Sequence, residues 1–247
     1  MEETREHSAV GKGSDPTLVL LPGLDGTGIL FRPLLAALPP NVPTLTCAYP
    51  GDVFLPPARL AETVAERIAD LGEVVILAES WSGLVCLELL RRKPMNVVGV
   101  IFVACFAEPP RPVLLALSRL LPLSMLMRLP LPTTLARRYC LGAKASAGQL
   151  TLFRKALAAV RPEVLAARLK SLRHIGPYAE PIVPPACYIQ AARDRLVPPS
   201  SVGAFRAMSP ILAVHWAEGP HFLLQSRPAE CAVIVADFVR TLTVPAH

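Results

Sequence analysis

The sequence predicts an α/β fold: a mostly parallel central sheet flanked by helices, with a helical segment inserted near the middle of the chain. Short apolar runs alternate with amphipathic stretches from residue 18 to residue 104, the rhythm of strands joined by right-handed helical crossovers. Between residues 106 and 185 this rhythm stops, and helical patterns broken by prolines take its place. The strand-and-helix rhythm then resumes, so both outer parts of the chain are expected to share one sheet.

The expected strands are short, and the continuous apolar runs at 18–21 and 74–78 indicate burial on both faces. They cover residues 18–21, 43–48, 74–78, 97–104, 186–191 and 211–217. Helices are expected at residues 28–38, 58–71, 82–92, 199–208 and 228–242, and the insertion should contain one helix around Leu150 and another from Pro162. The boundaries that follow are 1–105 for the first part of the core, 106–185 for a helical cap and 186–247 for the second part of the core.

Composition narrows the classes of protein that fit. Hydrophobic residues make up 52% of the chain and charged residues 18%, which favours a folded domain over a disordered one. The six cysteines form no C-x-x-C pair and lie mostly in apolar runs, so we expect reduced core residues. The five histidines show no metal-ligand spacing, and no metal site is expected.

Two segments bear on where the chain resides. Residues 1–16 lack the basic and apolar regions of an export signal. Residues 112–132 are apolar but contain arginines, serines and several prolines, unlike a helix that spans a membrane. We therefore expect a cytoplasmic protein without a transmembrane segment.

The turn at residues 78–83, Ala-Glu-Ser-Trp-Ser-Gly, joins an expected buried strand to an expected helix. Ser80 has a small residue two positions before it, Ala78, and another two positions after it, Ser82. Small side chains are needed there when a serine lies on a tight strand-to-helix turn and acts as a nucleophile. The usual motif has glycine at both positions, so this chain departs from it, although Gly83 follows directly. The alternative is a serine that only caps the helix.

A nucleophilic serine requires a base, and the base requires an acid that orients it. On sheets of this kind the chain order is serine, acid, histidine. His221 is the expected base, because it follows Gly-Pro in a loop after the last expected strand, whereas the other histidines after Ser80 lie in the insertion, within a strand or at the end of the chain. A loop histidine that caps the final helix is the alternative.

Asp194 is the expected acid, because it follows the strand at 186–191 and precedes a helix. Its alternative role is a surface ion pair with Arg193 or Arg195. Glu108, just after the strand at 97–104, is the second candidate for the acid.

The turn at residues 21–28, Leu-Pro-Gly-Leu-Asp-Gly-Thr-Gly, follows the first expected strand. Its glycines allow the backbone to approach a ligand closely. The backbone N–H groups of Leu24 and Trp81 are expected to face the oxyanion of a tetrahedral intermediate. Such a turn could instead hold a phosphate, but no lysine follows it and its G-x-x-G-x-G spacing misses the dinucleotide fingerprint.

These four motifs, in this order, resemble the α/β-hydrolase superfamily, and in particular small bacterial serine carboxylesterases with a helical cap. The resemblance covers nearly the whole chain. Residues 21–28 match the oxyanion turn, with Pro22 in place of a histidine, and Gly-Pro-His at 219–221 matches the base. The resemblance implies ester hydrolysis without a cofactor, and it excludes dehalogenase and epoxide hydrolase chemistry, which needs an aspartate at position 80.

The same motifs also serve other chemistries. An acyltransferase or thioesterase would use Ser80, Asp194 and His221 on carrier-bound or lipid acyl groups, and a non-catalytic binding protein could keep the fold alone. The expected substrate is a small-molecule ester with an apolar acyl group.

Basic residues are concentrated in the expected cap. Residues 106–180 contain 12 Lys/Arg and 3 Asp/Glu, against 13 and 16 in the rest of the chain. A positive surface rich in leucine and methionine is expected to attract an acyl group on an anionic carrier or a lipid surface, and salt should weaken that attraction. The alternative is a solvated face without a partner. Nucleic acid is not expected, because exposed aromatics are not interleaved with the basic residues.

Overall fold

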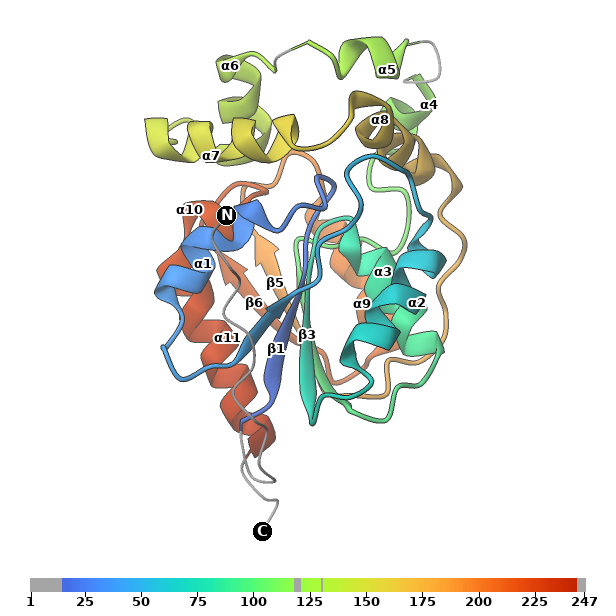
Figure 1. The fold of residues 1–247 in the computed structure, drawn as a ribbon, viewed down its shortest axis with the longest axis vertical. Coiled ribbons are helices and arrows are strands. Elements are labelled where there is room, and N and C mark those ends of the chain that lie inside the picture. Colours follow the sequence, from blue (N-terminus) through green and yellow to red (C-terminus); the bar gives the residue numbers. More distant parts are fainter. Residues whose placement is uncertain (1–14, 118–120, 130, 244–247) are drawn as a thin grey trace.

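The computed structural model describes residues 15–117, 121–129 and 131–243; the segment 1–14, where we expect no export signal, lies outside them. One sheet with the strand order β2-β1-β3-β4-β5-β6 runs between two layers of helices (Figure 1), and each of its pairings is parallel. This confirms the predicted fold class. The strands are β1 (Thr17–Leu21), β2 (Thr44–Thr46), β3 (Val74–Glu79), β4 (Val97–Val103), β5 (Ala186–Ala191) and β6 (Ala213–Ala217).

Helices cover both faces of the sheet (Figure 1). One face carries α2 (Pro57–Ile68), α3 (Ser82–Arg91), η5 (Pro199–Ser201) and α9 (Val202–Met208). The other carries η1 (Ile29–Phe31), α1 (Arg32–Ala37), α10 (Leu223–Ser226) and α11 (Pro228–Thr243).

Successive strand residues point to opposite faces and so build two apolar cores. Val19 and Ile76 pack with the helices α2, α3 and α9, whereas their neighbours Leu20 and Leu77 pack with α1 and α11. The central strands β3 and β4 are therefore apolar at most positions, with Glu79 at the end of β3 as an exception, which is why they appear in the sequence as continuous apolar runs. All six cysteines are buried and free, as expected.

The chain between β4 and β5 forms the inserted segment, which we define as residues 106–185. It contains α4 (Pro112–Leu117), α5 (Leu123–Leu126), α6 (Thr133–Leu135), η3 (Ala136–Leu141), α7 (Ala147–Ala158), α8 (Pro162–Ser171) and η4 (Leu172–His174). Helices α5 to α8 lie beyond one end of the sheet (Figure 1). Its described residues include no strand, in agreement with the sequence pattern.

The structure departs from the expected elements in several places. The helix expected at 58–71 ends at Ile68, and the strand expected at 43–48 covers only Thr44–Thr46. The helix expected at 28–38 divides into η1 and α1, and the one expected at 199–208 divides into η5 and α9. Strand β6 begins at Ala213 rather than at residue 211 and lies at the sheet edge, where His215 and Trp216 are exposed. Within the described ranges no helix is both long and apolar enough to cross a membrane.

Candidate active site

The predicted site residues meet at the end of the sheet formed by the carboxyl ends of its strands. Ser80 directly follows β3, Asp194 follows β5 and His221 follows β6, while the turn at 22–26 follows β1. Because the strands are parallel, their carboxyl ends lie together, which is where open parallel sheets bind ligands.

Ser80 occupies a sharp turn between β3 and α3. Its φ is 53°, in the left-handed region that costs a residue with a side chain about 1 kcal/mol or more. A hydrogen bond of 2.8 Å from the Ser80 N–H to the Val103 carbonyl holds this conformation. Gly83 lets α3 start close to the sheet, since a Cβ there would lie 2.8 Å from the Cys105 Cβ. The helix is capped by Trp81 without a side-chain hydrogen bond, so Ser80 is not its N-cap.

The three predicted side chains form a continuous chain of hydrogen bonds. Ser80 Oγ lies 2.8 Å from His221 Nε2, and His221 Nδ1 lies 2.7 Å from Asp194 Oδ2. The other carboxylate oxygen, Asp194 Oδ1, accepts hydrogen bonds of 2.8 Å from the N–H groups of Leu196 and Val197. Asp194 and His221 are both buried. A neutral imidazole with its proton on Nδ1 can therefore donate to Asp194 and accept from Ser80.

The protonation of His221 depends on opposing effects. Burial lowers the pKa of the imidazole, but the charge of Asp194 and its hydrogen bond outweigh burial, with a further contribution from Glu79, so that the pKa is raised above 6.5. The cationic imidazole is thus favoured relative to a free histidine.

The alternative roles for these residues find no support in the geometry. Glu108, the second candidate for the acid, is exposed. Arg193 pairs with Glu218 at 3.6 Å, and Arg195 donates to the Arg138 carbonyl, so neither holds Asp194. The final helix, α11, begins at Pro228, seven residues after His221, so His221 does not cap that helix.

The glycine-rich turn lies directly against the turn that contains Ser80. A Cβ on Gly23 would be 3.8 Å from the Ser80 Cβ, and a hydrogen bond of 3.0 Å from the Gly26 N–H to the Gly23 carbonyl closes the turn. Leu24 is the second residue of this closed turn. The structure thus brings the two predicted N–H donors, Leu24 and Trp81, to the same edge of the sheet as Ser80.

Ser82 connects the two turns. Its buried hydroxyl donates to the Pro22 carbonyl, and its oxygen lies 2.6 Å from the hydroxyl of Tyr49. Because the single hydroxyl proton of Ser82 goes to Pro22, Tyr49 is the donor in the second hydrogen bond. The residue that departs from the usual glycine therefore has a role that glycine could not fill.

Arg168 reaches the same turn from α8 and is 1% exposed. Its Nη1 donates to the carbonyls of Leu24 (3.0 Å) and Asp25 (2.7 Å), and its Nη2 donates to the carbonyl of Pro50 (2.9 Å). Its guanidinium carbon lies 5.8 Å from the ring centroid of Trp81.

Glu79 is a buried carboxyl group next to Ser80 in the sequence. Its Oε1 accepts a hydrogen bond of 3.0 Å from Gln225 Nε2, which also donates to the Leu30 carbonyl. Burial raises the pKa of Glu79 to about 7; Gln225 and His221 oppose this shift, and Asp25 adds to it. Glu79 therefore exchanges its proton near neutral pH, close to His221.

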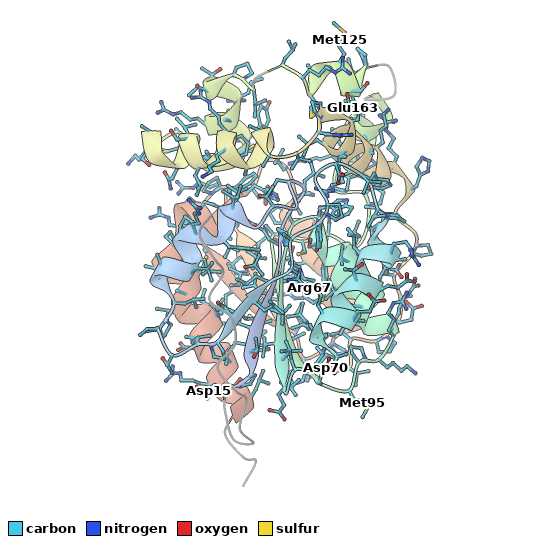
Figure 2. The ribbon with its side chains drawn as sticks, in the orientation of Figure 1. Asp15, Arg67, Asp70, Met95, Met125 and Glu163 are labelled. Carbon is cyan, nitrogen blue, oxygen red and sulfur yellow. The ribbon has the colours of Figure 1, made fainter. Side chains whose placement is uncertain are left out.

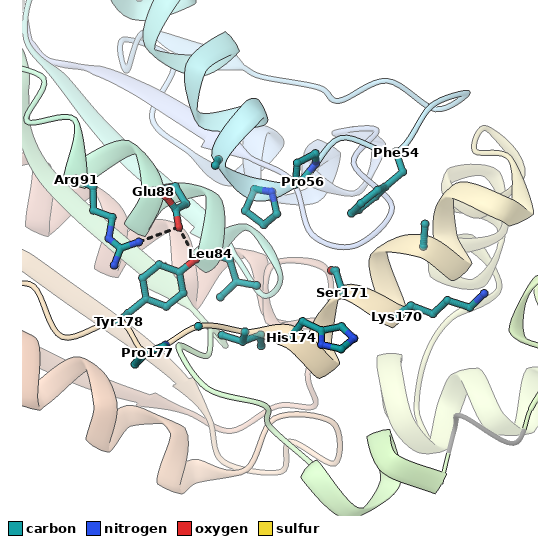
Figure 3. A pocket seen from close by; sticks show the side chains of 15 residues that line it. Phe54, Pro56, Leu84, Glu88, Arg91, Lys170, Ser171, His174, Pro177 and Tyr178 are labelled. Atoms are coloured by element: carbon teal, nitrogen blue, oxygen red, sulfur yellow. Dashed lines mark hydrogen bonds and ion pairs between the residues drawn. The ribbon is translucent and has the colours of Figure 1, made fainter.

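A cavity of about 550 Å³ lies between α8, η4 and the helices α2 and α3 (Figure 3). Ser171 lines it and accepts a hydrogen bond of 3.2 Å from Trp81 Nε1. At one end Glu88 accepts hydrogen bonds from Arg91 and Tyr178 (Figure 3). Ser80 and His221 are not among the lining residues.

Sequence reasoning did not identify Ser82, Arg168 or Glu79 as site residues. One signal was present for Arg168: it shares a helix face with Leu165 and Leu172, three residues before and four after it, so a charge falls within an apolar stripe. Among the described residues, no group of three or more His, Cys, Asp or Glu side chains could hold a metal ion.

The chain belongs to the alpha/beta hydrolase family, which it matches over residues 18–234. Family membership supports a hydrolase activity. No curated protein matches the chain.

Solved structures of similar fold include three from bacteria. An enol-lactonase from Burkholderia xenovorans LB400 superposes with a TM-score of 0.74 at 19% identity, covering 92% of each chain. A thermophilic esterase from Thermogutta terrifontis gives 0.71 at 16% identity, covering 94% of this chain and 92% of the other. A hydrolase from Oleispira antarctica gives 0.75 at 16% identity, with 92% of each chain covered. At these identities the likeness concerns the fold.

Proposed function

We propose that this protein is a serine esterase that hydrolyses carboxylic esters through an acyl-enzyme on Ser80. The observation that carries the proposal is the chain of hydrogen bonds from Ser80 Oγ through His221 to Asp194, with distances of 2.8 and 2.7 Å. This arrangement supplies a nucleophile, a base within reach of its proton, and a buried carboxylate that orients the base.

The first half of the reaction forms the acyl-enzyme. Ser80 Oγ attacks the ester carbonyl carbon while His221 Nε2 takes the hydroxyl proton, and Asp194 stabilises the imidazolium. The N–H groups of Leu24 and Trp81 bind the oxyanion of the tetrahedral intermediate. Its collapse breaks the bond to the alkoxy oxygen, and the alcohol leaves with the proton from His221.

The second half returns the enzyme to its starting state. Water attacks the acyl carbon as His221 Nε2 takes its proton, and the same N–H groups bind the second oxyanion. Collapse releases the carboxylic acid, and the proton returns to Ser80. Hydrolysis therefore needs no group beyond these side chains, the backbone and water.

The surroundings of the base favour an apolar acyl or alcohol group. The Phe222 ring meets the His221 ring edge-on at 5.4 Å, and Phe153 of α7 meets Phe222 in the same way. Both phenylalanines belong to an apolar cluster with residues of the inserted segment, such as Leu150. We propose that the inserted segment acts as a cap that contributes apolar surface beside the base.

An active-site probe tests the proposed nucleophile. The fluorophosphonate group reacts with a serine that a base has activated, so a fluorophosphonate probe should label the wild type once, at Ser80. Ser80→Ala should not be labelled, and peptide mapping locates the modified residue. A folded wild type that resists labelling would favour a binding protein on the same fold.

We further propose that the outer face of the inserted segment binds an anionic acyl carrier or lipid surface. Among the described residues from 113 to 129, five large apolar side chains are between 43% and 71% exposed: Val113, Leu121, Met125, Leu126 and Leu129. Figure 2 shows Met125 at the outer edge of this segment, above Glu163. Exposed apolar side chains within a basic segment combine two attractions, burial in acyl chains and attraction to negative headgroups.

Vesicle binding separates these attractions. Phosphatidylglycerol-containing vesicles should retain the protein at low salt and release part of it at high salt, whereas pure phosphatidylcholine should retain less. The double variant Met125→Asp, Leu126→Asp should reduce binding to both. If added salt does not lower the activity on a lipid substrate relative to the activity on a neutral ester, an electrostatic contribution is contradicted.

A further inference from the structure

Helix α8 contacts the backbone of the predicted oxyanion turn through Arg168. Among the hydrogen bonds between described residues, no other side chain of α8 reaches this turn. It lies 144 positions from Leu24 in the sequence, so this contact joins the inserted segment to the core. Its donors serve backbone carbonyls instead of a carboxylate. A buried arginine used in this way contributes charge-assisted hydrogen bonds that fix the backbone it touches.

The contacted carbonyls belong to the two central residues of the closed turn. Leu24 and Asp25 lie between Gly23 and Gly26, and both of their carbonyl groups accept from Arg168 Nη1. Fixing the carbonyl of Leu24 restricts the backbone on one side of this residue, and the turn hydrogen bond restricts it on the other. The Leu24 N–H direction is thereby defined.

Gly26 shows how closely the guanidinium approaches this turn. A Cβ at Gly26 would lie 2.5 Å from Arg168 Nη1, and the φ of Gly26 is 73°. Only glycine meets both conditions without strain. A side chain at position 26 would therefore clash with the Arg168 guanidinium.

The same helix also contacts the second predicted donor. The Trp81 indole N–H donates to Ser171 Oγ, which in turn donates to the Arg168 carbonyl at 2.6 Å. The guanidinium lies over the rings of Trp81 and Tyr49, at 5.8 Å from each centroid. One turn of α8 thus holds both residues whose N–H groups are predicted to bind the oxyanion.

We propose that Arg168 is a positioning residue that sets the geometry of the oxyanion site, so that turnover depends on how the inserted segment lies on the core. This inference rests on the proposed esterase function. Arg168 acts through the backbone of Leu24 and through Trp81, and it does not touch the reacting atoms. Its loss should weaken binding of the transition state more than binding of the substrate.

The test compares Arg168→Met and Arg168→Lys with a matched arginine. Arg137 also belongs to the inserted segment and donates to a carbonyl, that of Ala145 at 3.1 Å. Like Arg168, it has a buried Nε that finds no partner within the described residues. Arg137→Met therefore removes a partly buried arginine that donates to one carbonyl, against three for Arg168, and this carbonyl belongs to Ala145 rather than to the oxyanion turn.

Steady-state hydrolysis of p-nitrophenyl butyrate should separate the variants, once thermal unfolding shows each to be folded at the assay temperature. Arg168→Met should lower kcat about 10- to 100-fold with little change in KM, less than the about 10²–10³-fold loss expected for a whole oxyanion donor. Arg168→Lys should recover part of kcat, and Arg137→Met should lose stability but keep its kcat.

Inhibition by butylboronic acid, which binds a nucleophilic serine as a tetrahedral adduct, should weaken in Arg168→Met by about the factor lost in kcat. A folded Arg168→Met with wild-type kcat, or a loss confined to KM, would overturn the proposal. If Arg168→Met does not fold, Arg168→Lys decides, since one ammonium cannot bind three carbonyls in the same geometry: unchanged kcat overturns the inference. A wild type without activity or fluorophosphonate labelling would contradict the esterase function itself.

Discussion

The hydroxyl of Ser82 donates a hydrogen bond to the carbonyl oxygen of Pro22, joining the first turn of α3 to the turn after β1. These are the two segments that must stay in register if Leu24 and Trp81 are to bind one oxyanion. The serine is fully buried, and Tyr49 donates to it from the segment after β2. Ser82, which stands where the usual motif has glycine, therefore connects these segments through its hydrogen bonds.

Replacing Ser82 with alanine should affect both stability and turnover. The substitution leaves the Pro22 carbonyl and the Tyr49 hydroxyl without a partner, at a cost of about 1–3 kcal/mol in the free energy of unfolding. We expect kcat to fall as well, because the turn carrying Leu24 loses a restraint. Tyr49→Phe is the control: it removes only the outer hydrogen bond and should keep kcat near that of the wild type. Denaturant unfolding and ester hydrolysis measure the two effects, and equal kcat values in both variants would argue against a role in the site.

Replacing Asp194 with asparagine should reduce turnover about 10³- to 10⁴-fold, because the amide cannot stabilise the imidazolium and favours the wrong tautomer of His221. Glu108→Gln is the matched control and should retain activity, since Glu108 is exposed. Near-normal kcat in Asp194→Asn would return the role of the acid to Glu108.

The pH dependence of kcat/KM should show an acid limb with a midpoint above 6.5. His221 must be neutral to accept the Ser80 proton, and its pKa is raised by Asp194 and Glu79 despite burial. Activity is therefore lost as the pH falls through the raised pKa. Glu79→Gln removes one negative charge near the imidazole and should move the midpoint to lower pH, whereas Glu66→Gln, at an exposed position, should not. An unchanged midpoint in Glu79→Gln would contradict the electrostatic link.

The free energy of unfolding should fall as pH rises from 5 to 8.5, and Glu79 should be a main cause. Its pKa is about 7 in the folded protein, against 4.5 for an ordinary glutamate, so the folded state binds the proton more tightly and loses that advantage as the group ionises. This shift corresponds to about 3 kcal/mol. Glu79→Gln should remove much of this decline. The raised pKa of His221 also lowers the free energy of unfolding as pH rises, in the wild type and in Glu79→Gln. Urea unfolding of the wild type and Glu79→Gln at pH 5 and pH 8.5 tests this prediction. An equal loss of unfolding free energy in both proteins between the two pH values would contradict it.

The sequence allowed prediction of the sheet and of the three residues Ser80, Asp194 and His221, because each follows an apolar run and chain order limits their roles. Parallel strands then bring them to one edge without further information. The contacts of Arg168 with Leu24 and of Ser82 with Pro22 could not be predicted in this way. They depend on how a helix of the inserted segment and a helix start lie against a turn far away in the sequence, and local patterns do not encode such placements.

Hydrolysis of a p-nitrophenyl ester series from acetate to palmitate, measured for the wild type and Ser80→Ala, tests the central claim most directly. The account predicts hydrolysis by the wild type with an optimum at one acyl length, and loss of that activity in Ser80→Ala while the variant stays folded. Ser80→Ala with wild-type activity would contradict Ser80 as the nucleophile, and a folded wild type that hydrolyses no ester in the series would contradict the esterase function.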